Sequence, residues 1–353
     1  AYFVMSVPAG MIIKKIGYKK GVMLALGVVA LGLLLFIPAS MLQMYGFFLF
    51  ALFIVGSGIT ILQVAANPYI SALGSPEKAG SRLTLAGGFN SLATAIGPIV
   101  GGWLIFVDDN ASAIEKAESV QLPYLGLALF AGLLAILIGM SKLPKLSTEK
   151  EEGEIIEGSA WEYRHLILGA VGIFFYVGAE VAIGSILIDY LGQEEMGGMS
   201  NMDAAKFVSL YWTGAMIGRF VGAAVLQKVQ MNKALAIVSI AAMLLVLGGM
   251  VTTGSVSAWS LVAVGLVNSI MWPCIFPLSL KKLGKHTSQG SGILVSMVVG
   301  GALIPPLQGG IAEEIGYQLS FGLVLISYAY ILWFAIKGYK SGKISTMPET
   351  EEV

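Results

Sequence analysis

The chain has 353 residues, of which 56% are hydrophobic and only 12% are charged. A soluble domain carries about 25% charged residues, and a soluble protein of this size could not hide so much apolar surface from water. Lys plus Arg equals Asp plus Glu, at 21 each, so the net charge indicates no partner. These values exclude a soluble enzyme, a nucleic-acid-binding protein and a disordered chain. The single cysteine, Cys274, excludes a disulfide framework and a cysteine-ligated metal site.

Long apolar runs of the length that a helix needs to cross a bilayer, about 20 residues, follow one another along the chain. One short run covers residues 2–13. Ten full runs follow it, at 21–40, 44–72, 83–107, 121–141, 163–191, 207–227, 234–253, 257–280, 289–312 and 318–337. The runs do not alternate polar and apolar residues, so the sequence predicts an all-α polytopic membrane protein.

The chain begins with Ala-Tyr-Phe inside an apolar run, without an initiator Met or a signal peptide. We therefore expect an N-terminally truncated twelve-helix protein, whose first helix is missing and whose second helix is partial.

Basic residues gather in alternate loops. One set of loops and helix ends holds 19 of the 21 Lys and Arg, and the other set holds only Lys116 and Lys206. Cytoplasmic loops are rich in Lys and Arg, so the first set and the C-terminus are expected to face the cytoplasm. Arg219 belongs to this set, near a helix end, and is expected to reach the surface or to pair with a loop acid.

A polar interval rich in Glu divides the apolar runs into two groups. It predicts a solvated linker, and a regulatory docking segment is the alternative. A weak internal repeat, in which residues 6–20 align with 219–233, supports two related halves. The expected organisation is an N-terminal helical bundle at 1–141, a cytoplasmic linker at 142–162, a C-terminal helical bundle at 163–340 and a cytoplasmic tail at 341–353.

Acidic residues single out one position. An ionisable side chain at the bilayer centre costs about 2.5–3.5 kcal/mol, so each is a candidate functional residue. Twenty of the 21 acids fall in loops or at helix ends, and only Glu180 lies well inside a run. Tyr176 and Gly184 are four positions away on either side and share its helix face. A carboxylate, an aromatic ring and a gap predict a sugar-sized site; the alternative is a protonated Glu that bonds across helices as structural support.

Polar and indole side chains recur at helical spacing in both groups of runs: Gln63, Asn67, Asn90, Asn268 and Trp272. Amides donate and accept hydrogen bonds, as a hydroxyl-rich ligand requires, and an indole stacks on the apolar face of a sugar ring. Each amide alone fits an interhelical hydrogen bond at least as well. Together they predict a binding cavity between two halves.

Two stripes of small residues predict close helix packing rather than chemistry. They consist of Gly214, Gly218 and Gly222 in one run and of Gly97 and Gly101 in another.

Four stretches of the sequence resemble the major facilitator superfamily. They are LQVAANPYISALG at 62–74, LAGGFNS at 85–91, YVGAEVAIGS at 176–185, and NSIMWP with the later LGKHTSQGSGIL within 268–294. The resemblance is to its fucose–galactose–glucose symporter branch, and especially to bacterial glucose/galactose transporters. It implies the major facilitator fold of two six-helix bundles, in the bacterial cytoplasmic (inner) membrane.

Two departures from the family pattern concern charged positions. The loop motif after the second helix of the superfamily usually carries an Asp, and Lys14 stands in this stretch here. The fucose permease type has Glu in its fourth helix and Gln in its seventh, whereas this chain has Gln63 and Glu180 exchanged. A proton-carrying Glu in the fourth helix therefore cannot be carried over, and Gln63 can at most bind sugar. As a lone carboxyl in an apolar run, Glu180 is expected to bind the sugar or a coupling cation, which makes it the candidate for the cation-coupling role.

We expect a secondary active transporter that takes up a hexose by alternating access, coupled to a proton or less favourably to a sodium ion. It is expected to work as a monomer without a cofactor or a metal. The expected sugar-binding residues are Gln63, Asn67, Asn90, Tyr176, Glu180, Asn268 and Trp272. The alternatives are uptake of fucose or an amino sugar, and a sugar sensor that does not transport. A membrane enzyme would need several converging acids, His or Cys, and the runs offer one carboxylate.

Overall fold

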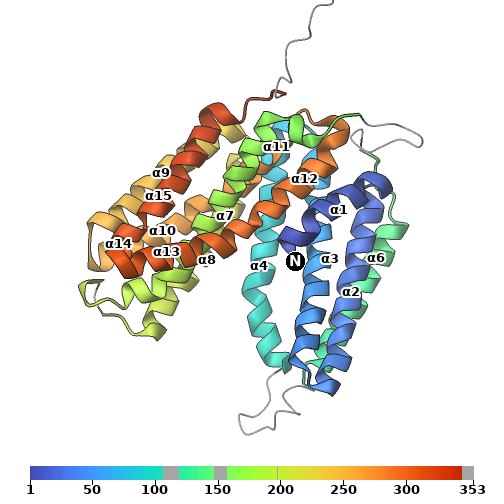
Figure 1. The fold of residues 1–353 in the computed structure, drawn as a ribbon, viewed down its shortest axis with the longest axis horizontal. Helices are drawn as coiled ribbons and strands as arrows, with labels where there is room; N and C mark the ends of the chain where they lie inside the picture. The colour runs from blue at the N-terminus through green and yellow to red at the C-terminus, as the bar shows by residue number, and fades with distance from the viewer. Residues whose placement is uncertain (106–118, 147–156, 197, 344–353) are drawn as a thin grey trace, which may run out of the picture.

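The computed structural model describes residues 1–105, 119–146, 157–196 and 198–343, and in these residues the regular structure is helical (Figure 1). Nine helical stretches within them are long and apolar enough to cross a membrane. Several predictions lie outside the described residues: the linker positions 147–156, the tail positions 344–353, and the loop residues Asp108, Asp109, Glu115, Lys116 and Glu118.

The first group of helices matches the first five predicted runs. It comprises α1 (Tyr2–Ile16), α2 (Tyr18–Leu42), α3 (Tyr45–Ala72), α4 (Ala79–Ile105) and α6 (Gln121–Met140). The chain passes from α1 to α2 through Gly17 alone, whose φ of 81° is disfavoured for a residue with a Cβ. This glycine lets two helices meet without a loop.

The second group matches the remaining runs but divides three of them, 257–280, 289–312 and 318–337. It comprises α7 (Arg164–Leu191), α8 (Asn201–Val225), α9 (Met231–Val251), α10 (Gly254–Asn268), α11 (Met271–Leu280), α12 (Thr287–Ser296), α13 (Gly300–Ile315), α14 (Tyr317–Ser320) and α15 (Gly322–Trp333). The predicted run 257–280 breaks between α10 and α11. Pro273 cannot donate to the carbonyl of residue 269 and crowds it, and the restart at Met271 places this proline in a first turn, where no N–H is needed. The run 289–312 is likewise interrupted, by a short 3₁₀ turn at Met297–Val299.

The core of the second group is built around α7, which packs against α8, α11, α13 and α15. Its membrane-spanning window is 61% buried, compared with 33% for α3 and 11% for α6. A polar side chain on α7 is therefore shielded from both water and lipid over much of its surface.

The two groups touch through α1 against α12 and through α4 against α8. Ser81 on α4 donates to the carbonyl of Ala223 on α8 at 2.6 Å, and Ser291 on α12 donates to the carbonyl of Val64 on α3 at 2.9 Å. All four residues are buried. The contact between the groups is therefore close and shielded from solvent at these residues.

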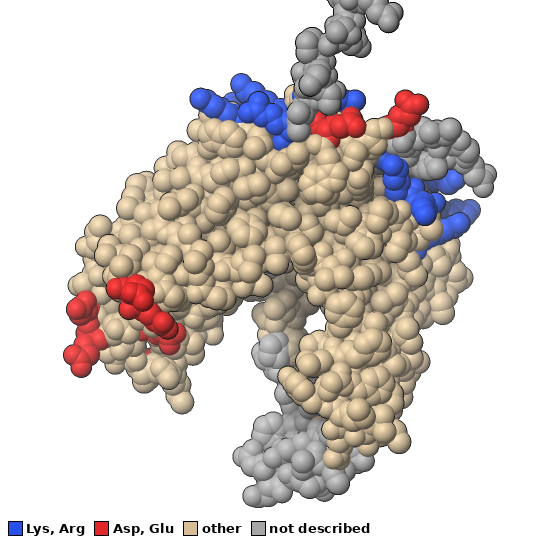
Figure 2. Space-filling view, in the orientation of Figure 1, with Lys and Arg blue, Asp and Glu red and all other residues tan. Residues whose placement is uncertain are grey.

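Basic side chains of both groups gather along one edge of the molecule, the upper edge in Figure 2. We call this edge the basic end; the C-terminal end of α1, with Lys14 and Lys15, and that of α11, which Lys281 and Lys282 follow, lie at this edge in Figure 1. In the same view the two lobes meet near the basic end and are separated by a deep hollow that opens away from it. In this conformation the molecule is closed at the basic end.

The two predicted glycine stripes differ in outcome. In the first, Gly218 lies against the carbonyl of Leu266, and Gly222 lies against Ile270, so α8 and α10 pack closely as predicted. In the second, a Cβ at Gly97 or Gly101 would meet no described atom within 4 Å. The prediction of close packing is therefore wrong for this stripe among the described residues.

Candidate functional site

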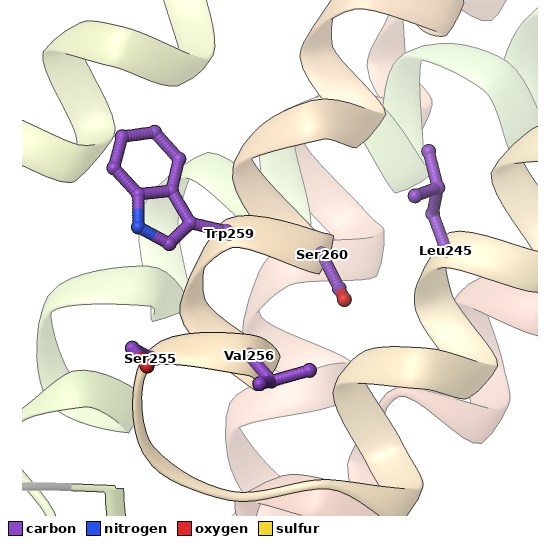
Figure 3. A pocket seen from close by; sticks show the side chains of 5 residues that line it. All are labelled: Leu245, Ser255, Val256, Trp259 and Ser260. Atoms are coloured by element: carbon purple, nitrogen blue, oxygen red, sulfur yellow. The ribbon is translucent and has the colours of Figure 1, made fainter.

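A shallow hollow of about 420 Å³ lies between α9 and α10, at the surface of the second group (Figure 3). Its lining is Leu245, Ser255, Val256, Trp259 and Ser260. It contains no titratable side chain and none of the predicted site residues. We therefore look for the functional site elsewhere, in the polar network around Glu180.

Glu180 lies at the middle of α7 and is only 8% exposed. The hydroxyl of Tyr176, one helical turn earlier, donates to its Oε1 at 2.8 Å. Tyr176 is itself 2% exposed. The shared helix face predicted from the spacing of four thus becomes a direct hydrogen bond in the buried core.

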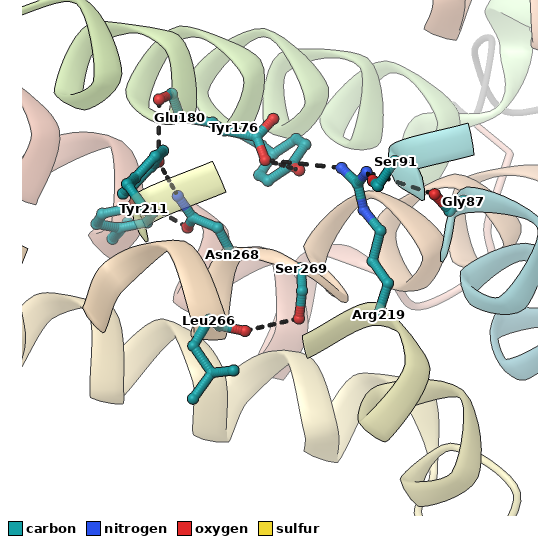
Figure 4. A network of polar contacts seen from close by, with 10 residues as sticks. Gly87, Ser91, Tyr176, Glu180, Tyr211, Arg219, Leu266, Asn268 and Ser269 are labelled. Atoms are coloured by element: carbon teal, nitrogen blue, oxygen red, sulfur yellow. Dashed lines mark hydrogen bonds and ion pairs between the residues drawn. The ribbon is translucent and has the colours of Figure 1, made fainter. Parts of the chain in front are cut away.

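Arg219 on α8 faces this carboxylate. Its Nη2 lies 3.9 Å from Glu180 Oε1, while its Nη1 donates to Ser91 Oγ and, at 3.5 Å, to the carbonyl of Gly87 on α4 (Figure 4). The prediction that Arg219 reaches the surface or pairs with a loop acid is wrong. The reason is that its side chain extends inward from α8 toward α4 and α7.

A second branch of the network starts from another residue of α8 and adds two further helices, α10 and α15. Tyr211 on α8 donates to the backbone carbonyl of Glu180 at 3.0 Å, and Asn268 Nδ2 on α10 donates to the Tyr211 hydroxyl at 3.0 Å. Tyr328 on α15 donates to Asn268 Oδ1 at 2.8 Å. Asn268 is fully buried, and both ends of its amide are bonded within the protein. Figure 4 shows Asn268 and Tyr211 beside the α7 residues.

The gap predicted beside Gly184 is filled. A Cβ at Gly184 would lie 3.2 Å from Cζ2 of Trp212, so the glycine makes room for the indole of α8. Trp212 also meets Tyr211 edge to face at 5.2 Å between ring centroids and remains 42% exposed. The expectation of an open space at this position is wrong, and an exposed indole stands there instead.

The other predicted site residues lie apart from this network. Gln63 Nε2 donates to the hydroxyl of Tyr2 on α1 at 2.9 Å. Trp272 is half-buried and stacks on Phe276 at 5.6 Å, one turn along the same helix. Asn67 is half-buried, and Asn90 is exposed and precedes Ser91 on α4. The structure thus brings Tyr176, Glu180 and Asn268 together, through Tyr211, and leaves Gln63, Asn67, Asn90 and Trp272 outside their hydrogen bonds.

Over the described ranges, no group of three or more His, Cys, Asp or Glu is arranged to hold a metal ion. The charged groups that meet at the centre of this network are a single carboxylate and a single guanidinium. Such a pair can bind hydroxyl groups or exchange a proton.

Comparisons with known proteins give the family. A family model described as the Major Facilitator Superfamily matches residues 1–299. The glucose/galactose transporter of Brucella abortus is 48% identical over 97% of this chain and 83% of its own length. The L-fucose-proton symporter of Escherichia coli is 33% identical over 95% of this chain and 81% of its own length.

A solved structure has the same fold. The crystal structure of a Major Facilitator Superfamily transporter in the outward conformation matches with a TM-score of 0.88 and 32% identity, over 96% of this chain and 87% of that chain. These findings confirm the predicted all-α fold and the prediction of a transporter rather than a membrane enzyme. The chain is a multi-pass membrane protein that belongs to the Major Facilitator Superfamily, in the branch of the glucose/galactose transporters and fucose symporters.

Proposed function

We propose that the protein is a secondary active transporter that takes up a hexose of the glucose or galactose type by alternating access, coupled to a proton. The observation that carries the proposal is the buried Glu180 carboxyl, held by Tyr176 and faced by Arg219, within a membrane-spanning helix. An intramembrane carboxylate marks ion pathways and proton relays in transporters.

The sugar is supported by the relatives. One of them is named a glucose/galactose transporter and another an L-fucose-proton symporter, which also makes the proton the favoured cation. The residues that we propose to bind the sugar are Gln63, Asn67, Asn90, Tyr176, Glu180, Asn268 and Trp272. Asn268 reaches the sugar only after a conformational change, because both ends of its amide are bonded inside the protein, and Gln63 at present donates from Nε2 to Tyr2.

The orientation follows from charge. Lys and Arg side chains are retained on the cytoplasmic side of a membrane, so we place the basic end in the cytoplasm of a bacterial inner membrane. The hollow then opens to the outer side, which is where an uptake transporter first binds its substrate. We assign residues 1–141 and 163–340 to the two bundles that rock against each other, with the linker and the tail in the cytoplasm.

The test is uptake of labelled hexose by the full-length protein in vesicles. The wild type should accumulate galactose or glucose when the outside is acidic, and a protonophore should abolish the accumulation. Glu180→Gln should lose accumulation but keep exchange of labelled for unlabelled sugar, because exchange requires no net proton movement. Glu314→Gln, an exposed acid of α13, is the matched control and should keep both.

The outcomes separate the alternatives. Accumulation that persists in Glu180→Gln would remove this residue from the coupling role. Dependence on sodium instead of protons would change the cation, and preference for fucose or an amino sugar would change the substrate. Binding of a hexose without exchange would favour a sensor on a transporter scaffold.

A further inference from the structure

Arg219 is the charged side chain of the site that contacts both groups of helices. Its guanidinium belongs to α8 of the second group and bonds to Ser91 and Gly87 on α4 of the first group. The same guanidinium faces Glu180 on α7 at 3.9 Å, and its side chain is 21% exposed (Figure 4). One cation therefore joins the candidate proton site to the contact between the two halves.

We propose that Arg219 is a positioning residue that transmits the charge of Glu180 to the contact between α4 and α8, so that loss of this charge loosens the closed basic end. The proposal rests on the coupling role proposed for Glu180 and adds that protonation of Glu180 acts on the contact between α4 and α8.

The surroundings of Glu180 make Arg219 its electrostatic partner. Tyr176 lies on the same helix, Tyr211 approaches from α8, and Tyr328 reaches it through Asn268. These groups are polar but uncharged near neutral pH. Within the described part of the chain, Arg219 is the cation within ion-pair distance of the carboxylate.

The Arg219 side chain is only 21% exposed, so most of it is shielded from bulk water. While Glu180 is ionised, the guanidinium has a counter-charge on α7 and two neutral acceptors on α4. It makes all three interactions only when α4 lies against α8. When Glu180 takes up a proton, the acceptors on α4 remain, but the counter-charge is gone. An uncompensated buried charge is costly, so states that give Arg219 access to water become more favourable. Separation of α4 from α8 at the basic end would provide that access.

The alternative is that Arg219 only braces α4 against α8 by its hydrogen bonds to Ser91 and Gly87. The two roles differ in their dependence on Glu180. If Arg219 is only a brace, its removal destabilises the closed form by the same free energy whether Glu180 is charged or neutral. If Arg219 transmits the charge, the effect of its removal depends on the charge of Glu180.

The experiment measures closure of the basic end directly in the full-length protein. Spin labels are attached at Lys15→Cys and Lys281→Cys, which are exposed ends of α1 and α11, in a Cys274→Ser background. Pulsed electron-spin distances are recorded for four forms: the unmodified pair, Glu180→Gln, Arg219→Gln and the double variant. Exposed Arg164→Gln on α7 is the matched control for loss of an arginine.

We expect Glu180→Gln to raise the ratio of the separated to the closed population by about fivefold or more, and the double variant to return most of the way to the unmodified ratio. Ser91→Ala, which removes one of the two acceptors on α4, should reduce the response to Glu180→Gln, and Arg164→Gln should change nothing. Additive effects of Glu180→Gln and Arg219→Gln would overturn the proposal and leave only the brace. Unchanged distances in all variants would overturn it as well.

The distances are independent of sugar, so the two proposals fail separately. Coupled hexose uptake together with additive distance effects would retain the proposed function and reject the role of Arg219. Arg219→Lys provides a further check, because it keeps the charge but loses the planar fork. It should restore the dependence of the distances on Glu180 at least in part, while an uncharged residue should not.

Discussion

Asn268 is a residue whose place in the structure differs from the role that its sequence position implies. Its amide is fully buried, and both ends are bonded to tyrosines, Nδ2 to Tyr211 and Oδ1 to Tyr328. In this conformation it ties α10 to α8 and α15. The alternative interpretation of a single amide, an interhelical hydrogen bond, therefore holds for Asn268 in the conformation that is closed at the basic end. Sugar binding by Asn268 requires a different conformation.

Tyr328→Phe tests this tie. The variant leaves Asn268 Oδ1 without its donor in a site that water does not reach, which should destabilise the protein by about 1 kcal/mol. The melting temperature of the purified protein in detergent should fall by a few degrees, whereas Tyr45→Phe, at a tyrosine that is 77% exposed, should have no effect. An unchanged melting temperature in Tyr328→Phe would mean that the bond is not formed or that another donor replaces it.

Trp212 is the exposed indole that stands beside Gly184, in place of the predicted gap. Its neighbour Tyr211 bonds to the carbonyl of Glu180, so the indole lies close to the candidate coupling residue. Stacking on a sugar ring is what an exposed aromatic face offers in such a place. We expect Trp212→Ala to weaken hexose binding about tenfold, which corresponds to about 1.4 kcal/mol, measured by equilibrium binding of labelled sugar.

The control for this variant is Trp259→Ala, at a second exposed tryptophan that lines the shallow hollow between α9 and α10. It removes the same amount of apolar surface and should leave binding unchanged. Equal losses in both variants would indicate a general effect on folding rather than a sugar contact.

Residue-level predictions succeeded where a chemical type stood out against its surroundings. Glu180 could be singled out because a carboxylate is rare in an apolar run, and Tyr176 because helical spacing fixes which residues share a face. Arg219 lies near a helix end, where most cations reach water, and no periodicity tells whether a long side chain turns outward or inward. Tyr211 was missed because a tyrosine in an apolar run has no distinguishing spacing.

At the level of elements, the lengths of the apolar runs predicted the helices, because a bilayer sets the length that a helix must have. The runs did not predict where helices break. The interruption between α10 and α11 has a local cause in Pro273, but Pro68 lies inside α3, which continues through it to Ala72. Whether a proline ends a helix depends on the neighbours that satisfy the freed carbonyl, and these are known only from packing.

The contact between α1 and α12 is made by glycines on both sides. A Cβ on Gly292 would lie 2.5 Å from the carbonyl oxygen of Ser6, and one on Gly10 would lie 2.7 Å from that of Ser288. Because these obstacles are backbone atoms, they cannot move aside as side chains do. Only glycine at these positions permits the observed approach of the two helices.

Gly292→Leu should therefore open the basic end. Overpacking of a close contact costs about 1–3 kcal/mol, and this cost falls only on the closed form, so the separated population should rise by about fivefold or more. The distance between labels at Lys15→Cys and Lys281→Cys measures it. Gly27→Leu on α2, where no atom lies within 4 Å of the added Cβ, is the matched control. A distance unchanged by Gly292→Leu would show that this contact plays no part in closure.

At the scale of the whole molecule, the halves touch near the basic end and part from each other on the opposite side (Figure 2). A site between two such lobes is exposed on one side at a time only if the contact at the basic end can be broken and remade. The bonds from Ser81 to Ala223 and from Ser291 to Val64 cross this contact, and both are local and weak enough to reverse.

A reversible cross-link across this contact tests the motion of the halves. Ser81 Oγ lies 2.6 Å from the carbonyl of Ala223, so Ser81→Cys/Ala223→Cys in a Cys274→Ser background places two thiols on facing turns of α4 and α8. A mild oxidant should form the bond in the closed form and reduce hexose uptake to background, and a reductant should restore it. Each single-cysteine variant should be insensitive to the oxidant. Uptake that continues in the fully cross-linked protein would mean that α4 and α8 need not separate, and the sugar would then have to leave by a route that keeps the basic end closed.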